Sequence, residues 1–329
     1  MLIEGISGQC DRAIAFGGKS GRRYRSSLAE DSLRNRLNCE PVLVRPIGEF
    51  SMIPKSHTTL RKMMVQNMAQ SSDKRATVLL QLTDTHLHAE QNSRMCGVST
   101  QETFLDVLNH IRKDSRWPPD AIVVTGDIVQ DKSRAGYQRF RETLQAFGLP
   151  VFCIPGNHDD PVLMTELLMT SPFQLCGDVK LGEWRVMLLS TFQKGEDAGA
   201  LGHDGLAVLE ESLSRYSEEQ VLICIHHQPL PMGSAWLDEV GLRDAQEFLE
   251  TIDRHDQVRA VLWGHVHQAS DRERNNVRFL STPSTCFQFL PDSDLFALDS
   301  RPPGMRWLVL EPDGKITTEV DWVDAADRM

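Results

Sequence analysis

The stretch Val78-Leu-Leu-Gln-Leu-Thr-Asp84-Thr-His86 begins as an apolar run and ends in two side chains that commonly bind metals. Its apolar part has the length and composition of a buried strand. In an extended backbone, residues separated by one position project to the same side. Asp84 and His86 are therefore predicted to hold one metal ion together at the end of a strand, with Thr85 pointing away.

The same arrangement, an apolar run followed by polar side chains, recurs four more times along the chain. The other four segments are Gly126-Asp127, Gly156-Asn157-His158-Asp159, His226-His227 and Gly264-His265-Val266-His267. In open α/β sheets, ligands bind beyond the carboxyl ends of the strands. One such segment could be accidental, but all five in this position predict a single site built from Asp, Asn and His.

From Ala76 onward, short apolar runs alternate with amphipathic stretches, which predicts an α/β domain. The runs predicted as strands covered on both faces are Val78–Leu82, Ala121–Val124, Val151–Ile154, Trp184–Leu189, Val221–Ile225 and Ala260–Trp263. The stretches with helical spacing are Thr103–Lys113, Tyr137–Phe147, Pro161–Met169, Leu206–Tyr216 and Ala245–Arg254. Pro161 is expected at a first helical position, with Asp160 as the N-cap.

Beyond Gly264 the pattern changes. Val277–Leu280, Met305–Leu310 and Lys315–Val323 are typical of antiparallel strands, the last two forming a hairpin around the Pro312-Asp-Gly314 turn. Phe287–Pro303, rich in Pro, Asp and Ser, is predicted to be a long loop.

Charge divides the chain into two parts. Residues 1–75 carry 13 Lys/Arg against 7 Asp/Glu, although the whole chain has a net charge of −11. These residues show little periodicity, so they are expected to be a basic leader, either disordered or the product of a translation start placed too early. Residues 76–325 are expected to form the folded domain.

The composition excludes several classes of protein. A net charge of −11 opposes binding to nucleic acid or anionic lipid, because like charges repel. No apolar run approaches the roughly 18 residues of a membrane span, and the first residues do not resemble a signal peptide. The expected location is the cytoplasm, and the expected partner is a small anionic molecule bound through metal ions. The oligomeric state stays open.

The polar segments contain the parts of a two-metal centre. Two divalent ions about 3.5–4 Å apart repel each other unless an anion lies between them. The carboxylate of Asp127 offers about four lone-pair sites, so Asp127 is predicted to bridge the metals. Asn157 would bring a neutral oxygen to the second metal. Nitrogen and oxygen ligands without thiolate suit Fe, Mn, Zn or Co.

These parts predict a hydrolytic mechanism for a phosphate ester. Two cations would bind phosphate oxygens and activate a bridging water, and the resulting hydroxide would attack phosphorus in line with the leaving oxygen. His158 is the predicted general acid for that leaving group, oriented by Asp159. His226 ends an apolar strand, where a buried imidazole needs a partner. His227 remains the alternative ligand at this strand end.

These residues resemble the calcineurin-like metallophosphoesterase superfamily, whose pattern D-x-H, G-D, G-N-H-D/E, H and G-H-x-H is complete here. Further segments resemble its bacterial class III 3′,5′-cyclic AMP phosphodiesterases. They are Leu82-Thr-Asp-Thr-His-Leu87, Thr125-Gly-Asp, His226-His-Gln-Pro-Leu-Pro231, Trp236-Leu-Asp238, Gly264-His-Val-His-Gln268, Thr282-Pro-Ser-Thr-Cys286 and Thr317-Thr-Glu-Val320. The resemblance spans about Ala76 to Val323, but it does not account for the basic leader. Gln228 also stands where close relatives often have His.

The resemblance implies a four-layer α/β/β/α sandwich and hydrolysis of 3′,5′-cyclic AMP to 5′-AMP, with iron or manganese as the usual metals. It assigns the first metal to Asp84, His86, Asp127 and His267. It assigns the second metal to Asp127, Asn157, His226 and His265. The substrate-binding residues that it implies are His86, Asp127, Asn157, His158 and His267.

Two other functions remain compatible with the sequence. One is a broader phosphodiesterase that acts on glycerophosphodiesters or 2′,3′-cyclic nucleotides, because a metal site recognises the phosphate whereas loops select the rest. The other is a non-catalytic scaffold that uses the same fold to bind a protein. Such a scaffold should have lost ligands, and this chain retains the full pattern. Trp236, Phe287 and Phe289 are candidates to line a base pocket.

Overall fold

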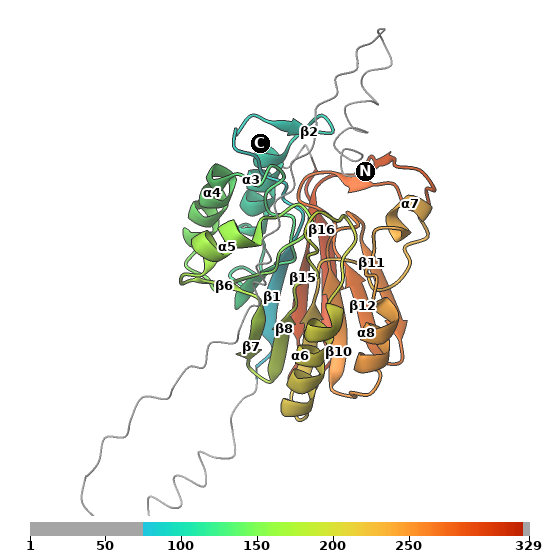
Figure 1. Cartoon of the computed structure of the whole chain (residues 1–329). Coiled ribbons are helices and arrows are strands. Elements are labelled where there is room, and N and C mark those ends of the chain that lie inside the picture. The colour runs from blue at the N-terminus through green and yellow to red at the C-terminus, as the bar shows by residue number, and fades with distance from the viewer. Residues whose placement is uncertain (1–74, 325–329) are drawn as a thin grey trace, which may run out of the picture. The chain divides into compact units, whose positions relative to one another are not determined.

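The computed structural model describes residues 75–324. The predicted basic leader therefore lies outside the described residues except for Arg75, and so does residue 325 at the end of the predicted domain. In the described part, two six-stranded sheets pack face to face and helices cover their outer faces (Figure 1). The layers follow the order helices, sheet, sheet, helices, which confirms the expected α/β/β/α sandwich.

The first sheet has the strand order β16-β15-β1-β4-β5-β6. Its strands are β1 (Thr77–Leu82), β4 (Ala121–Val124), β5 (Val151–Cys153), β6 (Phe173–Leu175), β15 (Gly304–Leu310) and β16 (Ile316–Trp322). The strands β1, β4, β5 and β6 run parallel, and β15 and β16 add antiparallel pairs at one side. The crossover helices are α3 (Thr100–Ile111), α4 (Arg134–Gln145) and α5 (Pro161–Leu168).

The second sheet has the strand order β11-β12-β10-β9-β8-β7. Its strands are β7 (Gly177–Leu181), β8 (Trp184–Leu188), β9 (Gln220–Cys224), β10 (Val258–Trp263), β11 (Ser270–Arg274) and β12 (Val277–Ser281), and its main helices are α6 (Gly202–Arg215) and α8 (Ala245–Ile252). Beyond Gly264, β12 pairs antiparallel with β11 as predicted, but on its other side it runs parallel to β10. Whether a strand runs parallel or antiparallel to its neighbour depends on which strand that neighbour is. The sequence of a short strand does not reveal this.

Several small elements lie near the carboxyl ends of the strands. They are the helix α7 (Ala235–Asp238) and the short strands β2 (Arg94–Met95), β3 (Val98–Ser99), β13 (Gln288–Phe289) and β14 (Leu298–Asp299). The predicted long loop Phe287–Pro303 is therefore partly wrong, because β13 and β14 pair within it as a hairpin. This pairing is only two residues long, which is too short for a periodic signal.

Apolar side chains fill three layers between the sheets and helices. In β1, Leu80 and Leu82 face the helices of the first sheet, whereas Leu79 faces the second sheet. Leu222 in β9 and Leu262 in β10 meet the first sheet from the other side. Strands covered on both faces must be apolar at successive positions, which explains the continuous apolar runs in the sequence.

Helix α5 begins as predicted. Pro161 is its first residue, and the side chain of Asp160 accepts hydrogen bonds from Val162 N at 2.9 Å and Leu163 N at 3.2 Å. These bonds satisfy backbone donors that have no partner within the helix. The cap holds the helix directly after the Gly156-Asn157-His158-Asp159 segment and so supports that segment.

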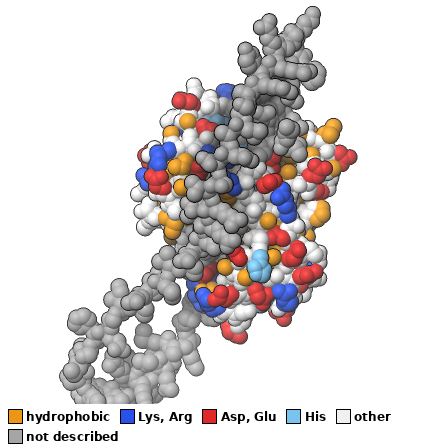
Figure 2. Space-filling model, viewed as in Figure 1, with side chains coloured by type: hydrophobic (Ala, Val, Ile, Leu, Met, Phe, Trp, Pro, Cys, Tyr) orange, Lys and Arg blue, Asp and Glu red, His pale blue; other side chains and the backbone are white. Residues whose placement is uncertain are grey.

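One face of the described part carries mixed charge. On the face shown in Figure 2, Asp and Glu side chains are interspersed with Lys and Arg side chains. This pattern differs from the continuous basic surface that nucleic-acid binding favours. Across residues 75–324, none of the helices has the length and apolar character needed to cross a membrane.

Candidate active site

The structure brings the five polar segments together at the carboxyl ends of both sheets. The first sheet contributes Asp84 and His86 after β1, Asp127 after β4, and Asn157 shortly after β5. The second sheet contributes His226 after β9, and His265 and His267 after β10. All seven side chains are buried. The candidate site is therefore assembled from two sheets, and neither sheet supplies it alone.

One group of acceptor atoms surrounds the imidazole of His86. Its Nε2 lies 3.1 Å from Nε2 of His267, 3.9 Å from Oδ1 of Asp84 and 3.8 Å from Oδ2 of Asp127. Nε2 of His267 lies 3.5 Å from the same oxygen of Asp84. Ligands bound to one ion at about 2.0–2.2 Å are separated by roughly 3–3.5 Å, so these four atoms could hold one metal.

The hydrogen bonds behind these imidazoles fix their tautomers. Nδ1 of His267 lies 2.8 Å from the carbonyl oxygen of Phe287, which can only accept, and Nδ1 of His86 lies 2.7 Å from Oε1 of Gln130. Both Nδ1 atoms therefore carry the proton, and both Nε2 atoms present lone pairs to each other. Burial lowers the pKa of His86 to about 3, so this ring is neutral. A cation between the two lone pairs would stabilise the arrangement.

A second group of acceptors surrounds His226. Its Nδ1 donates to the carbonyl oxygen of Thr125 at 2.7 Å, and its Nε2 lies 3.1 Å from Oδ1 of Asn157 and 3.3 Å from Oδ2 of Asp127. Nε2 of His265 is buried and has no hydrogen-bond partner within the described part of the chain. A buried polar nitrogen of this kind is costly unless something binds it. A second metal ion fits these residues.

Asp127 connects the two groups through one oxygen. Its Oδ2 faces both His86 and His226, whereas its Oδ1 accepts a hydrogen bond from His158 N at 2.9 Å. The backbone bond holds the carboxylate in this orientation. The donor set contains nitrogen and oxygen atoms and no thiolate, so the residues fit the predicted iron, manganese, zinc or cobalt.

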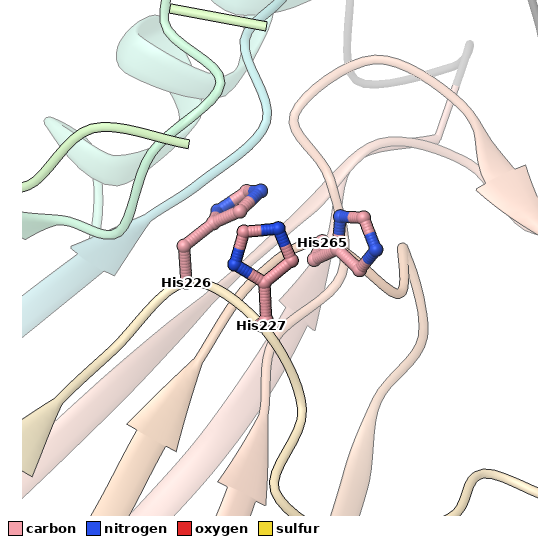
Figure 3. A group of neighbouring side chains, drawn as sticks. All are labelled: His226, His227 and His265. Carbon is pink, nitrogen blue, oxygen red and sulfur yellow. The ribbon is translucent and has the colours of Figure 1, made fainter. Parts of the chain in front are cut away.

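His227 lies beside this centre but has both ring nitrogens occupied. Figure 3 shows its imidazole close to those of His226 and His265. Its Nδ1 lies 2.7 Å from Oγ1 of Thr191, and its Nε2 lies 3.1 Å from the carbonyl oxygen of Asp197. That carbonyl can only accept, so Nε2 carries the proton and Nδ1 accepts from Thr191. This geometry favours His226 over His227 as the ligand.

The prediction that the two ligands of each pair project from an extended backbone is wrong. Asp84 and His86 have φ values of 53° and 45°, and His265 and His267 have φ values of 66° and 45°, so the backbone is left-handed and not extended. A left-handed conformation costs about 1–2 kcal/mol for a non-glycine residue. Hydrogen bonds from Asp84 N to Gly126 O at 3.0 Å and from His86 N to Asp127 O at 2.9 Å offset part of this cost.

Two glycines permit the close approach of the loops. A Cβ atom on Gly156 would lie 2.1 Å from Oδ1 of Asp127, and one on Gly264 would lie 2.0 Å from Oγ1 of Thr83. No side chain fits at these distances. Positions 156 and 264 therefore require glycine, because a Cβ atom would overlap neighbouring atoms. In the sequence, the only sign of this requirement is a glycine close to a predicted ligand.

Asp159 has a different role from the predicted one. It was expected to orient His158, but its buried carboxylate accepts from Ile128 N at 3.0 Å, Gly156 N at 2.9 Å and Tyr137 OH at 2.8 Å. These bonds join the loop after β4 to the loop after β5. Tyr137 supports the site through its bond to Asp159, and the sequence analysis did not identify it. The feature that could have indicated it is a hydroxyl group on the apolar face of a helix, which needs a hydrogen-bond partner when buried.

A pocket lies over the acceptor cluster. Its polar lining residues include all the predicted substrate-binding residues and are His86, Asp127, Asn157, His158, His265 and His267. Its apolar lining residues are Met95, Trp236, Leu237, Val240 and Phe289. His158 is half-buried at this pocket. Phe287, a predicted lining residue, packs instead against the rings of His267 and His86 at centroid distances of 5.0 and 6.3 Å.

Comparison with known proteins identifies relatives of this chain. Residues 77–269 match the family described as calcineurin-like phosphoesterase. The Haemophilus influenzae protein named 3′,5′-cyclic adenosine monophosphate phosphodiesterase CpdA is 39% identical over 265 residues, covering 80% of this chain and 96% of that protein. The protein of the same name from Escherichia coli (strain K12) is 41% identical over 243 residues, covering 74% and 88%.

A solved structure gives independent support for the fold. The crystal structure of a dimetal phosphatase from Danio rerio superposes on this chain with a TM-score of 0.51 and 14% sequence identity. The superposition covers 76% of this chain and 100% of that chain. At this level of identity the likeness shows the fold alone.

Replacement of Gly156 by alanine should weaken metal binding. The added Cβ would displace the Asp127 carboxylate, and we expect metal affinity to fall by about 10–100-fold, as when supporting residues of a metal site are lost. Metal content by mass spectrometry, on protein whose circular dichroism is unchanged, measures this. Gly195→Ala is the control for backbone strain without crowding, because its φ is +80° and nothing lies within 4 Å of its Cβ. Equal metal content in the two variants would contradict the proposed crowding.

Metal binding should also release a proton from His226. Burial opposes a charge on this ring, but the Asp127 carboxylate outweighs it and raises the pKa of His226 to about 9. Below that pH a metal at Nε2 must displace a proton, so affinity should increase by about tenfold per pH unit up to pH 9 and then level off. Calorimetry in buffers of different ionisation enthalpy measures the protons released. Affinity that stays constant between pH 7 and 9 would disprove this coupling.

Proposed function

This chain belongs to the calcineurin-like phosphoesterase family, and we propose that it hydrolyses 3′,5′-cyclic AMP to 5′-AMP. The observation that carries this proposal is its alignment with the two CpdA proteins over most of their length. The acceptor cluster around Asp127 supports a phosphoesterase independently of those names. The domain is assigned to residues 76–325, and the leader is no part of the proposal.

The proposed centre contains two metal ions. The first is assigned to Asp84, His86, Asp127 and His267. The second is assigned to Asp127, Asn157, His226 and His265. Iron and manganese are the proposed metals, with zinc and cobalt as alternatives that suit the same nitrogen and oxygen ligands. When bound, such ions supply Lewis-acid activation of water and of the phosphate oxygens.

His158 is the proposed general acid. Its backbone N donates to Asp127, which holds the residue beside the metal ligands, while its half-buried ring remains accessible from the pocket. Its ring centroid lies 5.2 Å from that of His86. From there it would donate a proton to the 3′ oxygen that leaves the phosphorus. His86, Asp127, Asn157 and His267 would contribute to phosphate binding through the metal ions that they hold.

The apolar lining residues of the pocket are proposed to bind the nucleobase. Trp236 packs edge to face against Phe289 at a centroid distance of 5.0 Å, and Phe289 stacks on His267 at 4.2 Å. This chain of contacts connects the apolar lining residues to the metal ligands. Nε1 of Trp236 is buried with no partner in the described part of the chain, so its N–H is available to a purine nitrogen.

The cytoplasm is the proposed place of this reaction, and a small cyclic nucleotide is the proposed partner. Nucleic acid and membrane surfaces are left out of the proposal because the chain carries a net charge of −11. A broader phosphodiesterase would share the metal site and differ in the apolar lining residues of the pocket. A non-catalytic scaffold would not need the complete set of acceptors.

Comparison of kcat/KM between substrates tests the proposed activity. We expect 3′,5′-cyclic AMP to be preferred over 2′,3′-cyclic AMP and over glycerophosphodiesters in protein loaded with manganese or iron. A preference for either of the other substrates would support the broader phosphodiesterase. Lack of turnover on all three, together with lack of metal binding, would support the scaffold.

Replacement of His158 by alanine should reduce kcat and leave metal content intact. Loss of a general acid commonly lowers turnover by about 10²–10⁴-fold, and the His158 side chain is not among the proposed metal ligands. Steady-state kinetics and metal analysis on the same preparation give the two values. A parallel loss of bound metal would instead make His158 a ligand or a support for one.

Replacement of Trp236 by alanine should raise KM for 3′,5′-cyclic AMP more than it changes kcat. Base stacking on an aromatic side chain contributes about 1–3 kcal/mol, which corresponds to a rise in KM of about 5–150-fold. Turnover of a glycerophosphodiester without an aromatic ring is the control. An equal effect on both substrates would argue against a base contact.

A further inference from the structure

The apolar interface between the two sheets ends in buried polar side chains directly below the candidate site. Gln81, Thr125, Thr282 and Arg306, here called the polar layer, are 0, 0, 0 and 3% exposed. They occupy the strand face that carries Leu79, Val123, Leu280 and Leu308 in the core between the sheets. Apolar side chains would be expected at these positions, so the polar layer needs an explanation.

The carboxamide of Gln81 joins the two sheets. Its Nε2 donates to Oγ1 of Thr125 at 2.9 Å, in the first sheet, and to the carbonyl oxygen of Trp263 at 3.2 Å, in the second. Its Oε1 accepts from Oγ1 of Thr282, also in the second sheet. One side chain therefore holds three strand ends in a fixed relation.

Arg306 extends this connection. It lies opposite Gln81 on the neighbouring strand β15. Its guanidinium donates to Oγ1 of Thr282 at 3.1 Å, to Ser281 O at 2.7 Å and to Ser270 O at 3.1 Å, all in the second sheet. Within residues 75–324 no carboxylate forms an ion pair with it. Burial of a charged side chain that has only neutral partners costs free energy of folding. This cost suggests that the bonds of Arg306 to the strand ends have a role in the site.

The polar layer is directly connected to the predicted ligands on both sides. Thr125 precedes Gly126 and Asp127, and its carbonyl oxygen accepts the Nδ1 proton of His226. Trp263 precedes Gly264 and His265. A displacement of these two residues would therefore displace ligands in both sheets.

We propose that the polar layer positions the two sheets so that the ligands from both can share Asp127. Apolar contacts are non-directional and permit small sliding of one sheet over the other, whereas hydrogen bonds are directional. Two metals about 3.5–4 Å apart tolerate little sliding. The inference rests on the proposed two-metal function. The four residues are positioning residues, because none of them lines the pocket.

The test compares two substitutions at Thr282. Thr282→Val preserves the shape but removes the hydroxyl that bonds to Gln81 and Arg306, whereas Thr282→Ser preserves the hydroxyl. Thr77→Val is the matched control, because Thr77 lies at the opposite end of β1 and its Oγ1 bonds to Leu181 O of the second sheet at 3.4 Å. Affinity for manganese is measured by competition with a chelator, without substrate, and the thermal melting of the metal-free protein is recorded.

We expect Thr282→Val to weaken the binding of at least one manganese ion by about 10–100-fold, with Thr282→Ser and Thr77→Val near the parent protein. Excess manganese should restore kcat in Thr282→Val. A purely structural role would lower the melting temperature of Thr282→Val and leave manganese affinity unchanged, which would overturn the proposal.

A second variant keeps the test decisive if Thr282→Val does not fold. Gln81→Met removes the three hydrogen bonds of the carboxamide at similar volume, and the same loss of affinity is expected. If the parent protein binds two manganese ions but both variants bind them as the parent does, the positioning role is wrong. If the parent protein binds none, the proposed function itself fails.

Discussion

The structure depends on one electrostatic constraint, the convergence of unshared acceptor atoms on the buried carboxylate of Asp127. The Nε2 atoms of His86 and His267, whose Nδ1 atoms already donate hydrogen bonds, lie 3.1 Å from each other and 3.5–3.9 Å from carboxylate oxygens of Asp84 and Asp127. Only cations can satisfy so many lone pairs away from water. The surrounding loops are organised to hold these atoms in place against their mutual repulsion.

The backbone around the site stores strain for the same reason. The predicted ligands with left-handed φ values are Asp84, His86, Asp127, His265 and His267. Each would be unfavourable in isolation, and such residues persist only where surrounding bonds determine their conformation. Asp159, which receives hydrogen bonds from two loops, is one source of that restraint. A rigid sandwich below the loops supplies the rest.

Phosphate chemistry and substrate choice are separated within the pocket. The proposed metal ligands suit any phosphate ester, whereas the aromatic lining residues Trp236 and Phe289 are the ones proposed to select a base. The fold is shared with a dimetal phosphatase at 14% identity, whereas the CpdA relatives are about 40% identical over most of the chain.

The sequence by itself determined the alternation of strands and helices, the start of α5 at Pro161 and the residue types that converge on Asp127, because these follow from local periodicity and from side-chain chemistry. It did not determine that β12 runs parallel to β10, that Asp159 joins two loops, or that both nitrogens of His227 are occupied. Nor did it indicate that Gln81 and Arg306 connect the sheets. Each of these depends on partners distant in the chain, and such contacts exist only once the two sheets have packed together.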